Sequence, residues 1–98
     1  MTTGDERDAA AARITDLIGE LKKRPGAGTA RMVEECEALV RAVNAFHMEG
    51  IRFRIYNVDR LLLQHAATLP AEPRTLLEEA RRHLEASGFH TRSHQSPV

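Results

Sequence analysis

The chain has 98 residues, a length that suits one small domain. Its 14 basic side chains balance 14 acidic ones, so the basic excess of a dedicated nucleic-acid binder is missing. No apolar run reaches the ~18 residues that cross a bilayer, and the polar start of the chain lacks the apolar segment of a signal peptide. We therefore expect a cytoplasmic protein with no membrane or nucleic-acid partner.

A first helix is predicted from about Asp5 to Arg24. Its apolar side chains recur at helical spacing on one face, at Ile14, Leu17, Ile18 and Leu21. Acidic residues cluster at its start and basic residues at its end, as the helix dipole favours. The sequence Pro-Gly-Ala-Gly at residues 25–28 then predicts a turn.

A long central helix is predicted from Thr29 to Leu69. Apolar residues recur at helical spacing on both sides of Gly50, at Met32, Val33, Cys36, Leu39, Val40, Val43 and Phe46 before it and at Ile51, Ile55, Val58, Leu62 and Leu69 after it. The second stripe is rotated by roughly 60° from the first, which indicates a drifting face or a kink at Gly50. Two helices joined at Gly50 are an alternative, and so is a strand through residues 51–55, where apolar and basic residues alternate.

A third helix is predicted from about Pro73 to Ser87, with Gly88 as the residue that ends it. Its apolar face comprises Leu76, Leu77, Ala80 and Leu84. Residues 89–98 are mostly polar and are predicted to be a tail. The sequence therefore predicts an all-α fold of three helices in a single helical domain over residues 1–88.

Two short helices cannot cover every side of a helix about 60 Å long. The apolar stripe that they leave exposed predicts an antiparallel helical-bundle homodimer or a higher oligomer. The residues expected at this interface lie in the middle of the central helix, at Val40, Val43, Gly50, Ile51, Ile55 and Val58. Gly50 would lie where the two helices cross, because its missing side chain allows a close approach.

Four side chains with polar or reactive groups interrupt the apolar stripe, at Cys36, His47, Arg54 and His65. A two-fold axis between Gly50 and Ile51 would place Cys36 opposite the partner's His65. We expect both side chains to be packed in the core, as free cysteines and lone histidines on an apolar face usually are. The alternatives are a metal site, because a thiolate facing an imidazole suits Zn(II) or Cu(I), and a Cys–His nucleophile pair.

The same axis would place His47 opposite the partner's Arg54. His47, Arg54 and the nearby Glu49 are therefore candidate ligand-binding residues. Arg54, with Arg52 and Arg60 close by in the sequence, also has the chemistry to bind a dicarboxylate in a pocket.

The spacing of Cys36 and His65 on a long helix is similar in outline to that of the copper-sensing repressor family. Those proteins are small all-helical dimers that hold metal between a Cys near the start of the second helix and ligands near its far end on the other protomer. The resemblance implies that Cys36 and His65 are the first and last ligands. The intermediate ligand position falls on Leu61, which cannot bind metal, and the basic residues of the family's first helix are largely missing.

These patterns predict a non-catalytic helical module that self-associates and binds a protein partner or a small ligand, with no cofactor. The first alternative is a metal- or ligand-responsive regulator that uses Cys36 and His65 across the dimer. The second is a small all-helical enzyme with an arginine-lined pocket at the seam between protomers.

Overall fold

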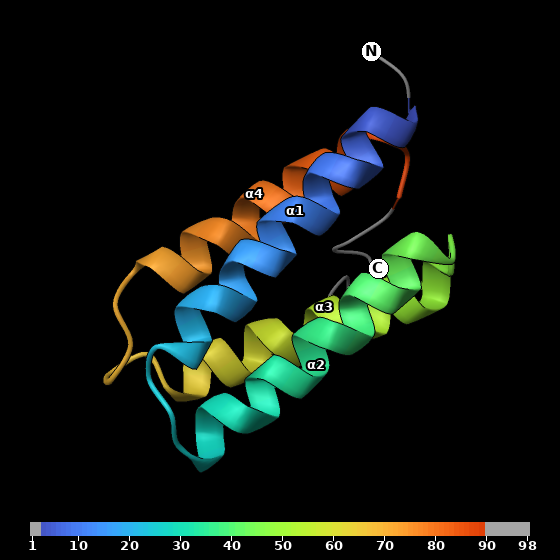
Figure 1. Cartoon of the computed structure of the whole chain (residues 1–98). Helices are drawn as coiled ribbons and strands as arrows, with labels where there is room; N and C mark the ends of the chain where they lie inside the picture. The colour runs from blue at the N-terminus through green and yellow to red at the C-terminus, as the bar shows by residue number, and fades with distance from the viewer. Residues whose placement is uncertain (1–2, 90–98) are drawn as a thin grey trace, which may run out of the picture.

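The polypeptide runs up and down through four helices within residues 3–89, the part that the computed structural model describes (Figure 1). The helices are α1 (Thr3–Lys22), α2 (Ala27–Asn44), α3 (Met48–Gln64) and α4 (Glu72–Ala86). The all-helical prediction is confirmed, but the prediction of three helices with a long central one is wrong. The expected central helix is two helices, α2 and α3, as in the two-helix alternative, although they join before Gly50. The strand considered as another alternative at residues 51–55 is part of α3.

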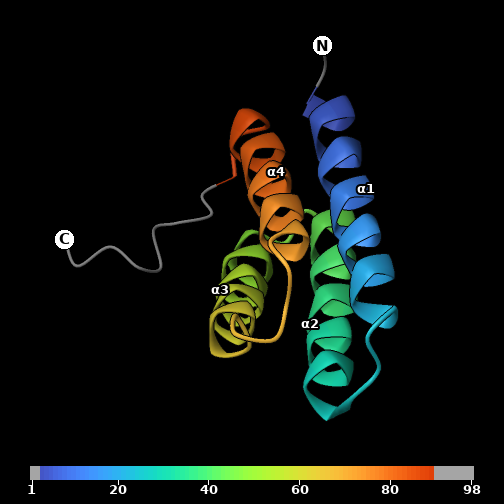
Figure 2. The ribbon, with the colours of Figure 1, turned by 90° about the vertical axis from the view of Figure 1, so that its left-hand side faces the viewer.

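The helices form two antiparallel pairs, α1 with α4 and α2 with α3 (Figures 1 and 2). The first pair lies over the second, and α1 also packs closely on α2, whereas α3 and α4 touch only slightly. No helix in the described range has both the length and the apolar character needed to cross a membrane.

The predictions for the outer helices α1 and α4 agree with the structure to within a few residues at each end. Helix α4 ends as expected at Gly88, whose φ of 99° suits a glycine. The N–H groups of Gly88 and Phe89 donate to the carbonyls of Glu85 and Leu84 at 3.0 and 2.9 Å, which is the Schellman pattern. Phe89, expected to begin the tail, is buried against the core, and the remaining tail residues, 90–98, lie outside the described range.

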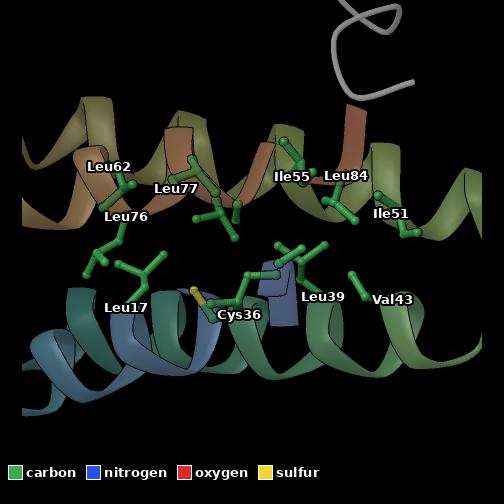
Figure 3. Packing of buried hydrophobic residues seen from close by; sticks show 14 of the residues in the cluster. Leu17, Cys36, Leu39, Val43, Ile51, Ile55, Leu62, Leu76, Leu77 and Leu84 are labelled. Carbon is green, nitrogen blue, oxygen red and sulfur yellow. The ribbon is translucent and has the colours of Figure 1, made fainter. Parts of the chain in front are cut away.

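One apolar core lies among the four helices, and Figure 3 shows it with α3 and α4 on one side and α1 and α2 on the other. Each helix contributes side chains at helical spacing: Ala10, Ile14, Leu17 and Leu21 from α1, Met32, Cys36, Leu39 and Val43 from α2, Ile51, Ile55, Val58, Leu61 and Leu62 from α3, and Leu76, Leu77, Ala80 and Leu84 from α4. The two halves of the predicted long stripe therefore meet the same core from two antiparallel helices. The sequence pattern identified most of the buried residues correctly, although it joined two helices into one.

The break between α2 and α3 comes at residues 45–47, before Gly50. The N–H groups of Phe46 and His47 donate to the carbonyls of Val43 and Ala42 at 3.2 and 3.0 Å, so α2 also ends in a Schellman pattern. The position that usually holds glycine in this pattern is occupied by Phe46, with φ at 58°. A left-handed conformation costs a residue other than glycine roughly 1–2 kcal/mol.

The burial of apolar side chains of α3 offsets the strain at Phe46. Folding α3 back onto α2 buries Ile51, Ile55, Val58 and Leu62 to 1% exposure or less. Each such side chain contributes roughly 1.5–3 kcal/mol when it leaves water. The total exceeds the cost of one strained residue several times over, and burial within one chain avoids the entropy loss of bringing two chains together.

Candidate functional site

A surface hollow of about 520 Å³ lies between α2 and α3, next to the turn that joins them. The three residues predicted to bind a ligand, His47, Glu49 and Arg54, all line it. We call this feature the α2–α3 hollow; the other residues that line it include Ala38, Arg41, Ala42 and Phe53. The structure thus brings the predicted trio together within one chain.

His47 begins α3 as its N-cap. Its Nδ1 atom accepts a hydrogen bond from the N–H of Gly50 at 2.8 Å, which satisfies one of the unpaired amides in the first turn of the helix. In the neutral ring, accepting at Nδ1 places the proton on Nε2. The predicted ligand-binding histidine therefore has a structural task, as a helix cap.

Arg54 connects α3 to α2. Its Nη1 atom donates to Oε1 of Glu35 at 3.1 Å, and the amide of Asn57 donates to the same oxygen at 3.2 Å. The guanidinium also lies 5.2 Å from the centre of the Phe53 ring. Arg54 is therefore already neutralised by a carboxylate of its own chain and is not a free anion-binding group.

Glu49 lies at the rim of the α2–α3 hollow, with 77% of its side chain exposed. It accepts a hydrogen bond from Nη1 of Arg52 at 2.9 Å, one turn further along α3. Such an exposed pair contributes little to stability. Its carboxylate remains accessible from outside the molecule.

The apolar residues of the α2–α3 hollow were missed as site residues by the sequence analysis. Ala38 and Ala42 of α2 and Ala45, the residue that caps its end, follow one another at spacings of four and three residues along the hollow. Phe53 faces them from α3, with 49% of its surface exposed. The small residues at helical spacing were the available signal, but alanine is common in helices and the pattern alone does not distinguish a groove from ordinary helix propensity.

Cys36 and His65 lie apart within this chain. The antiparallel register of α2 and α3 places Glu35 beside Arg54 and Gly28 beside His65. His65 therefore lies near the start of α2, eight residues before Cys36, or about 12 Å along the helix.

Cys36 itself has no exposed surface, and its side chain points into the core among Leu39 and its neighbours (Figure 3). Burial, together with the nearby carboxylates of Glu35 and Glu37, raises the pKa of the Cys36 thiol to about 12. The thiol therefore stays protonated at neutral pH. For Cys36 to share a metal with the partner's His65, the core would have to open.

The apolar residues predicted at a dimer interface serve the core of the single chain. Val43, Ile51, Ile55 and Val58 have no exposed surface, and Val40 packs partly buried against them. Gly50 lies in the first turn of α3, where a Cβ atom would meet the His47 ring, and not at a helix crossing. The stripe that led us to expect a second copy is covered by the chain itself.

Within residues 3–89, no group of three or more His, Cys, Asp or Glu side chains is placed to hold a metal ion. The α2–α3 hollow combines the three predicted ligand-binding residues with the half-exposed Phe53. No protein-family model, curated protein or solved structure matches this chain.

Proposed function

We propose that this protein is a non-catalytic, cytoplasmic helical module that associates with a second copy of itself through the outer surface of α2 and α3. The observation that carries the proposal is the half-exposed Phe53 beside the α2–α3 hollow. An exposed phenylalanine next to an apolar depression is typical of an interface.

Two features of this surface support self-association. It presents a protruding ring, Phe53, and an apolar depression beside Ala42 on the same face. A two-fold axis through this face would place each Phe53 in the hollow of the other copy, so that one pair of features forms two identical contacts. The partner's Phe53 would then lie against the small alanine side chains, which leave room for a ring.

Charge supports the same arrangement. Arg41 lines the α2 side of the hollow and has no carboxylate partner within residues 3–89. Glu49 lines the α3 side and is exposed. In an antiparallel pairing each Arg41 would approach the partner's Glu49, which within its own chain is paired with Arg52.

Light scattering tests the proposal with three proteins. As its concentration is raised to about 200 μM, the wild type is expected to reach twice the 10.9 kDa mass of one chain. Phe53→Glu is expected to keep the mass of one chain. Leu63→Glu is the matched control, because Leu63 is 52% exposed on α3 but does not line the hollow. Circular dichroism would verify that both variants remain helical.

A monomeric wild type across that range would overturn the proposal. Equal dissociation by Leu63→Glu and Phe53→Glu would also overturn it, because the association would then not depend on the α2–α3 hollow.

A further inference from the structure

A second hollow, of about 510 Å³, lies at the other end of the molecule, where the connection from α3 meets the start of α4. One side is apolar and includes Leu62, Leu69, Pro70 and Pro73. The other side carries Arg74, Thr75, Glu78 and Arg82 from α4. We call this feature the α4 hollow.

Glu78, the carboxylate that lines the α4 hollow, already forms an ion pair with Arg81, which does not line the hollow. Oε2 of Glu78 accepts a hydrogen bond from Nη1 of Arg81 at 2.6 Å. Arg81 is only 2% exposed, whereas 41% of the Glu78 side chain is exposed, so this ion pair lies at the edge of the core with its carboxylate side open to water. Asp59 lies 3.9 Å from Nη2 of Arg81 and adds a second acidic group behind the hollow.

Two arginines of the α4 hollow are left without a carboxylate. Arg74 and Arg82 form no ion pair within residues 3–89. They lie eight residues apart on one face of α4, about 12 Å along the helix, on either side of Glu78. Among the residues that line the hollow, Arg74 and Arg82 against Glu78 leave a net charge of +1.

We infer that the α4 hollow binds a small organic phosphate. The planar guanidinium groups of Arg74 and Arg82 are suited to hold phosphate oxygens through paired N–H donors. On the apolar side, Leu69 and Pro70 are accessible and would cover an apolar or aromatic part of the same molecule, with the buried Leu62 and Pro73 behind them. This site lies away from Phe53 and does not depend on self-association.

Titrations followed by amide NMR shifts test the inference with three probes. Phenyl phosphate carries both features of the expected ligand, inorganic phosphate carries only the charge, and phenol carries only the ring. Phenyl phosphate is expected to cause saturable shifts around the α4 hollow and to bind about tenfold more tightly than either of the others, since each loses one set of contacts.

Arginine variants localise the binding. Arg74→Gln and Arg82→Gln should each weaken phenyl phosphate binding about tenfold, because each removes a charged donor pair. The matched control is Arg31→Gln, an exposed arginine of α2 that does not line the α4 hollow. The control should bind as the wild type does.

Three results would overturn the inference. The first is the absence of saturable shifts with phenyl phosphate, and the second is equal binding by phenol or by inorganic phosphate. The third is a loss of affinity in Arg31→Gln as large as that in Arg82→Gln, which would indicate general attraction to a basic surface.

Discussion

The Nδ1 atom of His47 accepts the backbone N–H of Gly50 at 2.8 Å, and this hydrogen bond begins α3 at the point where the chain reverses. A Cβ atom on residue 50 would lie 2.5 Å from Nδ1 and 3.3 Å from the Cβ of Ala42. The absence of a side chain at Gly50 is thus what allows His47 to cap the helix. The glycine that the sequence suggested as a crossing point serves the turn instead.

Gly50→Ala should therefore lower the free energy of unfolding by about 1–2 kcal/mol, because the histidine must move and its cap is lost. Gly19→Ala is the matched control: Gly19 lies inside α1, and a Cβ atom there would meet nothing within 4 Å. That variant should gain roughly 0.5–1 kcal/mol from helix propensity. Urea denaturation measures the change in the free energy of unfolding for each variant. A stabilised Gly50→Ala would contradict the role of the His47 cap.

Loss of Glu35, which links α2 to α3 through hydrogen bonds, should lower the stability of the fold more than loss of the exposed Glu49. Glu35 has only 15% of its side chain exposed and accepts hydrogen bonds from Arg54 and Asn57. Glu35→Ala is expected to cost about 1–2 kcal/mol, since it leaves two partly buried donors unpaired. Glu49→Ala, which removes an exposed partner of Arg52, should cost less than about 0.5 kcal/mol. Chemical denaturation distinguishes the two, and equal effects would show that the Glu35 contacts add nothing.

Alkaline pH should destabilise the fold through Cys36. The folded thiol has its pKa raised to about 12 from the ordinary 9.0, so between these values the unfolded chain loses a proton that the folded chain retains. Stability contributed by this group is present below about pH 9 and falls as the pH rises, by up to about 1.4 kcal/mol per pH unit. Denaturation at several pH values should show that the free energy of unfolding declines less with rising pH for Cys36→Ala than for the wild type. Equal declines in the two proteins would contradict the raised pKa of Cys36.

A charge at Val43 should unfold the chain and not merely separate two copies. Val43 has no exposed surface and packs inside the core of a single chain. Val43→Asp buries an unpaired carboxylate and is expected to cost several kcal/mol, a large part of the stability of a small domain. Circular dichroism should show loss of helix at room temperature. A fully helical, monomeric Val43→Asp would instead favour an intermolecular role for this residue.

The outer helices could be predicted because local signals and burial agree there. α1 ends before the Pro25–Gly26 turn, α4 has Pro73 in its first turn and ends before Gly88, and each helix has a single apolar face. Between them the local signals were misleading. Glycine suggested a break at residue 50, whereas the chain breaks at Phe46, a residue with little preference for a left-handed turn.

The candidate site was predicted in part. His47, Glu49 and Arg54 do line one hollow, but their capping and ion-pair partners follow from the antiparallel register of α2 and α3, which periodicity does not contain. The Cys36–His65 pairing assumed that the two halves of one helix meet in another chain. Since they meet in the same chain, the thiol is covered and the imidazole lies beside Gly28.

The sequence by itself determined the all-helical class and most of the core, because a period of 3.6 residues leaves the same apolar face whether a helix is long or broken. Only the tertiary structure decided where the central segment turns. The energy of burying four large side chains of α3 outweighs the strain at one residue, and no local pattern reports a balance that is reached between distant parts of the chain.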